Sequence, residues 1–227
     1  MPFESGGLAD KLGNRYEERW VVSQLLSLME EKIKSVTIEA IGDDEQGVDL
    51  WIVQKNGVRQ AQQCKARNAS KEYWSITDLI SRGVLSKIRF QLDRDPYYEF
   101  AFVASVGSEV FKDICEYARR SNNDAGSFYR EKILKAGQEV QACFRHFYTF
   151  FSLDPDMESD LNQAFAYLKR TYIYVYPDDQ ATWQTLLDRT GYLLIGDSET
   201  VVATLLTYAE NKDRFGSPIF ADELRNY

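Results

Sequence analysis

One stretch, VDLWIVQKNGVRQAQQCKA at residues 48–66, constrains the fold more than any other part of the chain. Its first six residues form an apolar run, and its last nine alternate in the pattern of a half-buried strand. Asn56-Gly57 lies between them, and this dipeptide is typical of tight hairpin turns that need positive φ angles. A β-branched run, SVTIEAIG at 35–42, precedes the stretch and is joined to it by the turn-rich GDDEQG. The sequence therefore predicts an antiparallel three-stranded meander.

Helices and a further strand are predicted on both sides of this meander. Apolar residues recur at helical spacing over 10–33, and a second helix is predicted over 75–92, with Gly83 weakening its middle. The apolar run at 98–106 follows that helix, so a right-handed crossover would place it in the sheet as a parallel strand. The predicted fold class is α/β, with a core of helix, antiparallel three-strand meander, helix and parallel strand.

The rest of the chain is predicted to be mostly helical. One strand is expected at 171–176, followed by helices at about 179–190 and 198–211. We expect breaks in the preceding helical region near Gly137 and Pro155. Residues 1–106 are therefore assigned to a core, and residues 107–227 to a mostly helical extension that completes the domain and offers an oligomerisation surface.

Composition excludes several classes of function. Three widely spaced cysteines without a CxxC pair indicate reduced core thiols, and a single histidine argues against His-based zinc sites and hydrolytic triads. We find no apolar run of membrane-spanning length and no secretory leader, so a cytoplasmic protein without membrane contact is expected. The net charge of −8 disfavours nucleic acid at first sight. However, residues 154–227 hold 13 acidic against 6 basic residues, whereas residues 1–153 hold 22 against 21.

A possible site is suggested by an acid or amide two residues before a lysine. This pattern occurs three times, at Glu30–Lys32, Gln63–Lys65 and Glu210–Lys212. Residues two apart diverge around a helix but point to the same face of a strand. Only Gln63 and Lys65, on the predicted third strand, can therefore act on one site, with Asp49 on the adjoining strand.

Such a set suits metal-assisted hydrolysis of a phosphodiester. Carboxylate, amide and backbone oxygens are the hard ligands that Mg²⁺ prefers, and a lysine can orient water or stabilise developing charge. Glu17, on the first predicted helix, adds a carboxylate that this helix can direct towards the Asp49 strand. The alternative is that Asp49 caps a turn, Lys65 is a solvated strand residue and Glu17 is a surface charge.

The motifs GGLADKLGNRYEERW, GVDLW and QQCKARN together resemble the PD-(D/E)XK nuclease superfamily. More narrowly, they resemble the Mrr/Cap-type N-terminal endonuclease domain of bacterial antiviral STAND NTPases of the Avs kind. The resemblance covers residues 5–68 and extends less closely through YWSITDLISRGVL. It implies a restriction-endonuclease-like fold, cleavage of double-stranded DNA with Mg²⁺ or Mn²⁺, and activation by oligomerisation.

The resemblance also implies roles for individual residues. Asp49 is then the primary metal ligand and Lys65 the catalytic lysine, with Glu17 near the metal and the backbone carbonyl of Cys64 as a further ligand. Gln63 takes the second acidic position, and this departure from the family name removes one negative charge from the site. Val48 replaces the proline.

Partners follow from the same resemblance. Double-stranded DNA is the expected substrate, and Arg67, Asn68, Lys71 and Arg82 are candidate DNA contacts, although each is equally explained as a solvated surface residue. Other copies of the chain are expected partners in a homo-oligomer. The chain contains no GxxxxGK[ST] loop, so a fused STAND NTPase and sensor region are expected in a longer protein. Two alternatives stay open: a catalytically inactive PD-(D/E)XK-like assembly or nucleic-acid-binding module, and an RNA-cleaving nuclease.

Overall fold

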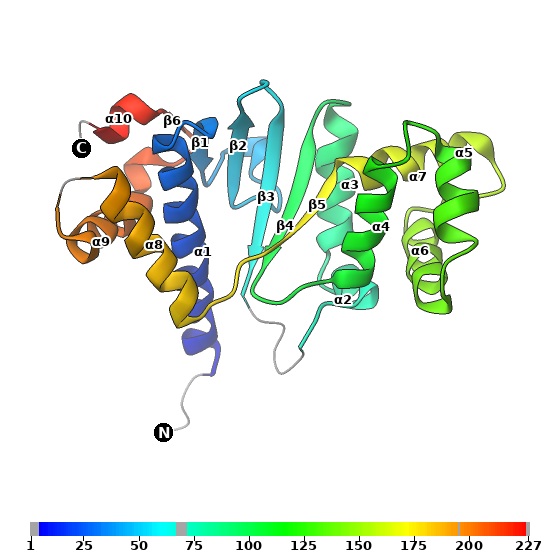
Figure 1. Cartoon of the computed structure of the whole chain (residues 1–227), viewed down its shortest axis with the longest axis horizontal. Helices are drawn as coiled ribbons and strands as arrows, with labels where there is room; N and C mark the ends of the chain where they lie inside the picture. The colour runs from blue at the N-terminus through cyan, green and yellow to red at the C-terminus, as the bar shows by residue number, and fades with distance from the viewer. Residues whose placement is uncertain (1–4, 67–71, 195, 226–227) are drawn as a thin grey trace. The chain divides into compact units, whose positions relative to one another are not determined.

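The structure is a computed structural model that describes residues 5–66, 72–194 and 196–225, with side chains from residue 15 onward. It has a mixed α/β architecture (Figure 1). One six-stranded sheet has the order β5-β4-β3-β2-β1-β6. The strands are β1 Ile33–Ile38, β2 Leu50–Gln54, β3 Arg59–Lys65, β4 Glu99–Ala104, β5 Thr171–Val175 and β6 Pro218–Ile219. The α-helices are α1 Ser5–Met29, α2 Ile76–Ser81, α3 Val84–Arg94, α4 Glu109–Arg119, α5 Ala125–Phe128, α6 Gln138–Phe150, α7 Glu158–Arg170, α8 Gln180–Leu193, α9 Ser198–Ala209 and α10 Ala221–Arg225.

The chain divides into two compact units, each assembled from separate stretches. The first unit comprises Met1–Arg67, Val103–Ser105 and Val175–Tyr227, and the second comprises Asn68–Phe102 and Val106–Tyr174. The first unit thus joins the two ends of the chain. The domain boundary near residue 106 stays a prediction.

The predicted meander is confirmed in the first unit. Strand β2 pairs antiparallel with both β1 and β3. The hairpin turn forms at the predicted dipeptide: Gly57 has φ +89°, and the amide of Val58 donates to the side chain of Asn56 at 3.0 Å. Strand β6, which sequence patterns did not predict, pairs antiparallel with β1. Because β6 has two residues, it lacks the periodicity on which strand prediction depends.

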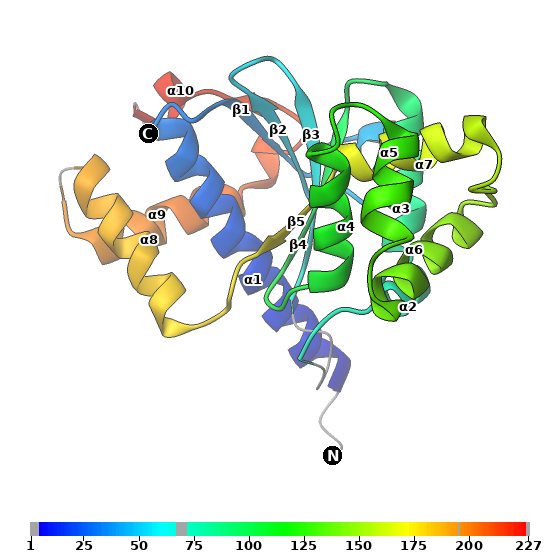
Figure 2. The same ribbon diagram turned by 45° about the vertical axis from the view of Figure 1, so that its right-hand side comes forward.

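Helix α1 links the meander to the C-terminal helices of the first unit. It contacts β1 and β3 and also α8, α9 and α10, which lie beside it in both ribbon views (Figures 1 and 2). The guanidinium of Arg189 on α8 binds the carboxylate of Glu30 at 3.0 and 2.9 Å and the hydroxyl of Ser23 at 2.9 Å. Both partners belong to the α1 segment, so charge-assisted bonds add to the apolar packing. Residues 180–225 therefore pack against the N-terminal helix.

The second unit encloses an aromatic core contributed by the helices after β4. Phe128, Phe144, Phe147 and Phe151 are buried there. The rings of Phe147 and Phe151 lie 4.6 Å apart, within the range of favourable aromatic pairs. Gly137 precedes α6, and Pro155 lies between α6 and α7, as predicted.

Three predicted element boundaries are corrected by the structure. The helix predicted over 75–92 is two helices, because Gly83 adopts a left-handed φ of +71° between α2 and α3. The strand predicted at 35–42 ends at Ile38, where Glu39 turns to φ +45°. The first helix begins and ends earlier than predicted. Within the described ranges, no helix is both long and apolar enough to cross a membrane.

Candidate functional site

An irregularity at the start of β2 positions Asp49. The amide of Asp49 donates to the carbonyl of Gln62 at 2.9 Å, and Leu50 pairs with that same residue. Two consecutive residues of one strand thus oppose a single residue of the next, which is the arrangement of a β-bulge. A bulge redirects the side chain of its extra residue, so Asp49 departs from the simple alternation of β2.

The redirected carboxylate reaches across to the neighbouring strand. Its Oδ2 accepts the backbone amide of Cys64 at 2.5 Å. A charged acceptor forms shorter and stronger hydrogen bonds than a neutral one, so this contact holds the carboxylate at the end of β3. The Cys64 thiol is fully buried, and burial raises its pKa well above the usual range. Cys64 therefore contributes a neutral side chain and a backbone peptide to this corner.

Alternation along β3 places Gln63 and Lys65 on the opposite face from Gln62. The indole of Trp20 on α1 donates to Oε1 of Gln62 at 2.8 Å, so Gln62 faces α1. Gln63 is 1% exposed, and its Oε1 has no hydrogen-bond partner among the described residues. Lys65 is half-buried at the last position of β3. The shared face predicted for Gln63 and Lys65 is consistent with this strand geometry.

Glu17 is a half-buried carboxyl on α1 close to the same corner. Burial is the main cause that raises its pKa to about 7, and the negative charge of Asp49 adds to the increase. The positive charge of Lys65 acts in the other direction. Asp49 and Lys65 therefore each lie within electrostatic range of Glu17. No contact of the Gln63 side chain with them is seen among the described residues.

Glu39 is a member of this group that sequence patterns missed. It follows β1 directly, and its amide donates to the carbonyl of Asp49 at 3.0 Å. Burial raises the pKa of the Glu39 carboxyl, with a further increase from the nearby charge of Asp49. The only available signal was an acid at each end of the loop joining the first two strands, at 39 and 49. Such a pair identifies cross-strand neighbours only once the strand register is known.

A cleft of about 340 Å³ opens beside these carboxylates within the first unit. Its charged lining consists of Glu17, Glu18, Glu39, Asp49, Glu210 and Lys212. Five acids and one lysine give the cleft an acidic character, which attracts cations and repels phosphate. Any polyanionic substrate would therefore need positive charge at this corner.

The donor atoms suit a hard divalent cation in kind. Asp49 and Glu17 offer carboxylate oxygens, the unpaired Oε1 of Gln63 lacks a donor, and Cys64 offers a backbone carbonyl. In the described part of the chain, no three His, Cys, Asp or Glu side chains form a group able to hold a metal ion. The predicted metal ligands include the Gln63 amide and the Cys64 backbone carbonyl, so they do not require three such side chains. The metal assignment stays a prediction.

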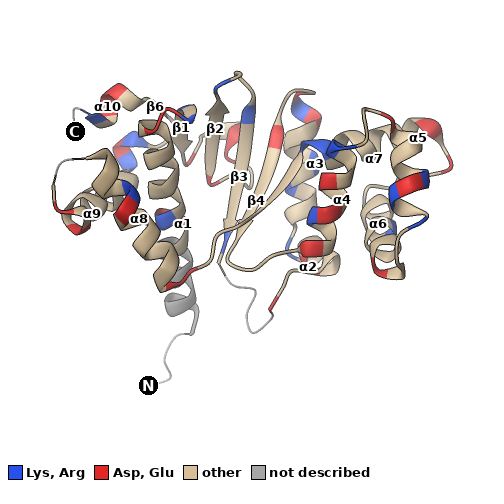
Figure 3. Ribbon diagram, in the orientation of Figure 1, with Lys and Arg blue, Asp and Glu red and all other residues tan. Residues whose placement is uncertain are grey.

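The predicted DNA contacts are mostly outside the described structure. Arg67, Asn68 and Lys71 fall between the described ranges, whereas Arg82 is exposed at the end of α2. Basic and acidic residues occur together on α4 and around α5, as the coloured ribbon shows (Figure 3). These segments give no uniformly basic helix face.

Comparisons with known proteins give one informative similarity. No protein-family model matches the chain, and no curated protein matches it significantly. Among solved structures, the chain resembles the Moraxella osloensis Cap4 SAVED/CARF-domain containing receptor, with a TM-score of 0.53 and 12% sequence identity. The match covers 95% of this chain and 46% of the receptor chain, so the chain spans about half of the receptor's length. At this identity the likeness concerns the fold alone.

Proposed function

We propose that the chain is a metal-dependent endonuclease that hydrolyses phosphodiester bonds of double-stranded DNA, with a restriction-endonuclease-like core. The observation that supports the proposal is the hydrogen bond by which the Cys64 amide holds the Asp49 carboxylate, with Glu17 within electrostatic range of both Asp49 and Lys65. Two acids and one lysine at a strand end provide the charges that phosphodiester hydrolysis requires.

A bound Mg²⁺ would polarise the scissile phosphate and lower the pKa of a coordinated water. The chain would hold that ion through Asp49, Glu17, the amide oxygen of Gln63 and the carbonyl of Cys64. The hydrogen bond from the Cys64 amide fixes the Asp49 carboxylate in advance, so little reorganisation is needed there. The ammonium of Lys65 would stabilise negative charge that develops on the phosphate and orient the attacking water.

The proposed biological role is that of an effector in bacterial antiviral defence. The sequence motifs resemble a Cap-type nuclease domain, and the similar solved structure is a Cap4 receptor. The similarity to that receptor supports the defence context, whereas the nuclease assignment rests on the sequence motifs and the proposed site residues. In this proposal, the chain is part of a longer cytoplasmic protein and becomes active when copies assemble.

A non-catalytic module is the second candidate. Two features favour it. Gln63 is an amide where the family name has an acid, and no three His, Cys, Asp or Glu side chains of the described residues form a metal-binding group. Such a module would hold nucleic acid or assemble with copies of itself without cutting.

The primary test is cleavage of supercoiled plasmid with Mg²⁺ or Mn²⁺ by the wild type and by Lys65→Met. Methionine retains the apolar stem but removes the charge, so we expect cleavage to fall by about 100-fold or more. Parallel reactions with tRNA and single-stranded DNA identify the preferred substrate, and cleavage of RNA alone would replace DNA in the proposal. Because assembly is the proposed trigger, the assay includes a fusion to a tetrameric coiled coil. Absence of metal-dependent cleavage by that fusion would contradict an enzymatic function.

Glu39→Gln should weaken divalent-cation binding by about fivefold, because it removes one nearby attractive charge of roughly 1 kcal/mol. Calorimetric titration with Mn²⁺ measures the change. The matched control is Glu18→Gln, which lines the same cleft beside Glu210 and Arg15 and acts on Glu17 less strongly than Glu39 does. Equal weakening in both variants would show that Glu39 acts only through the general charge of the cleft.

A further inference from the structure

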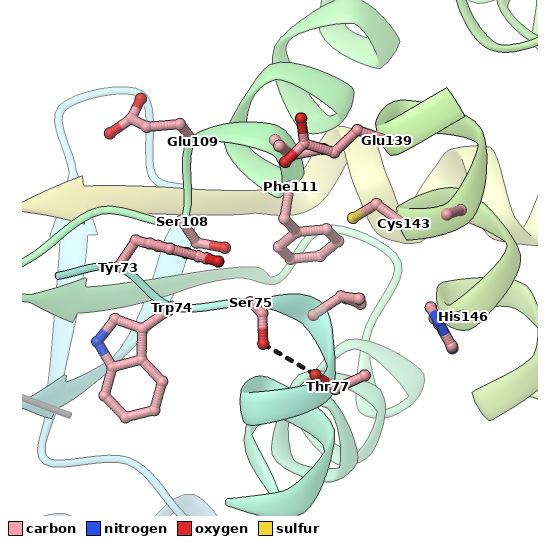
Figure 4. A pocket seen from close by; sticks show the side chains of 13 residues that line it. Tyr73, Trp74, Ser75, Thr77, Ser108, Glu109, Phe111, Glu139, Cys143 and His146 are labelled. Carbon is pink, nitrogen blue, oxygen red and sulfur yellow. Dashed lines mark hydrogen bonds between the residues drawn. The ribbon is translucent and has the colours of Figure 1, made fainter. Parts of the chain in front are cut away.

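The second unit contains a separate pocket of about 500 Å³ (Figure 4). It lies between the segment that enters α2, the N-terminus of α4 and one side of α6. None of its lining residues belongs to the proposed nuclease site. An inference about this pocket is therefore independent of the nuclease proposal.

The hydroxyl of a buried residue, Ser108, lines the pocket and makes no capping hydrogen bond. Ser108 is the N-cap residue of α4 and is 2% exposed, but its side chain makes no capping hydrogen bond. In Figure 4 its hydroxyl points towards the middle of the pocket, as does the phenol of Tyr73. Ser75, the N-cap residue of α2, contrasts with it because its hydroxyl accepts the amide of Asp78 at 3.2 Å. The Ser108 hydroxyl is thus available to a ligand at the positive end of a helix.

Three aromatic residues line the pocket, of which Trp74 and Phe111 are buried and Tyr73 is exposed. The indole of Trp74 is 4% exposed and packs edge-on against Phe102, with 5.2 Å between ring centroids. The ring of Phe111 is held against Phe147 at 5.7 Å. Tyr73 is 62% exposed at the pocket and can close over a bound group. Packed rings of this kind favour a flat ligand with apolar faces.

The charges of the lining select against phosphate. Its acidic residues are Glu109 and Glu139, its one ionisable nitrogen is the imidazole of His146, and the described lining includes no lysine or arginine. Glu109 is 3.7 Å from Lys112, whereas Glu139 has no ion pair or hydrogen bond within the described structure. The Glu139 carboxylate reaches into the pocket from α6 (Figure 4). It would accept N–H groups from a neutral ligand.

We propose that this pocket binds a nucleobase carrying an exocyclic amine, presented by a free nucleoside or by an unstacked base of a single strand. Such a base is flat and apolar on both faces, and its edge carries amino donors beside ring acceptors. The amine donates to Glu139, a ring nitrogen accepts from Ser108, and the faces contact the aromatic wall. The sugar and any phosphate remain at the open side.

The test is calorimetric titration of the whole chain with adenosine, cytidine and uridine. Adenosine or cytidine should bind saturably with Kd on the order of 0.1–1 mM, and uridine should bind more weakly because it lacks the amine. Glu139→Gln should lower the affinity about tenfold, whereas Glu116→Gln, which is outside the pocket, should not change it. Ser108→Ala should reduce binding without altering the urea midpoint, because its hydroxyl makes no cap bond.

Two further measurements decide whether the ligand is a free nucleoside or a base of a single strand, and whether the pocket is specific for such a base. A short single-stranded oligonucleotide and its abasic counterpart are titrated alongside the nucleosides, and a preference for the strand with bases identifies an unstacked base as the ligand. Saturable binding of free nucleosides alone identifies a nucleoside site. The proposal is overturned if neither form binds up to about 10 mM, or if phenol binds as tightly as adenosine and loses no affinity in Glu139→Gln.

Discussion

Replacing Asp49 with Asn should reduce metal-dependent cleavage by about 1,000-fold or more while the chain stays folded. The carboxylate is the only predicted ligand that is both charged and fixed by a backbone hydrogen bond. Asparagine keeps an oxygen that can accept the Cys64 amide, so the bulge and the strand pairing are retained. It removes the charge that attracts a divalent cation, and loss of a primary metal ligand removes most of the electrostatic stabilisation of the transition state.

Alanine is a less informative substitution at this position. It would leave the Cys64 amide without its acceptor and cost about 1–3 kcal/mol of stability, so lost activity and lost structure would be confused. Asp43→Asn, in the turn before β2, provides the matched control because it removes one exposed acid from the same region. Cleavage is measured on supercoiled plasmid, and urea unfolding verifies the fold. More than a tenth of wild-type activity in Asp49→Asn would contradict its assigned role.

Local sequence patterns were sufficient to predict the framework of the site. The Asn-Gly dipeptide has the predicted turn, and β3 pairs with β2 as predicted. The predicted half-buried alternation of β3 was wrong, because its residues 60–64 are all buried and both faces of the strand are therefore covered. Helix geometry predicted that Glu30–Lys32 and Glu210–Lys212 diverge, but both pairs lie beyond the ends of α1 and α9. Lys32 binds Glu30 at 2.8 Å, so this prediction was wrong for that pair, and Glu210 and Lys212 line the same cleft as Asp49. Short-range geometry of this kind is encoded residue by residue.

The position of Asp49 could not be derived in the same way. Simple alternation would place the Asp49 side chain on the same face as Trp51, two residues later. The bulge opposite Gln62 instead redirects this side chain to the amide of Cys64. A bulge depends on how two strands share hydrogen bonds, which a single strand sequence does not contain. Glu39 was missed for a related reason, because its proximity to Asp49 follows from strand register.

Long-range packing was also beyond the sequence patterns. The acidic C-terminal part was predicted as a helical extension, but α8 and α9 pack against α1 within the first unit. The contacts that decide this, such as Arg189 with Ser23 and Glu30, join residues far apart in the chain. Each of these side chains alone has the pattern of a solvated helix charge. Tertiary contacts of this kind override local expectation.

Glu17→Gln should stabilise the metal-free protein above neutral pH. Burial raises the pKa of Glu17 to about 7, so the folded state holds this proton more tightly than the unfolded chain does. Between about pH 4.5 and 7 folding therefore takes up a proton, and stability falls as the pH rises through this window. Above it, the folded state retains a penalised carboxylate. Because solvent screens this half-buried group, we expect glutamine to add about 1–2 kcal/mol at pH 8.

Urea unfolding at pH 4.5, 6 and 8 measures this effect, with EDTA present to remove metal. The difference between Glu17→Gln and wild type should be smallest at pH 4.5, where the folded carboxyl is protonated and the unfolded one is about half ionised, and should reach its maximum at pH 8. Addition of Mn²⁺ at pH 8 should then stabilise the wild type more than Glu17→Gln, because only the wild type offers the carboxylate. A difference that is constant across pH would show that Glu17 is solvated like an ordinary surface acid, and an equal response to Mn²⁺ would remove Glu17 from the proposed metal site.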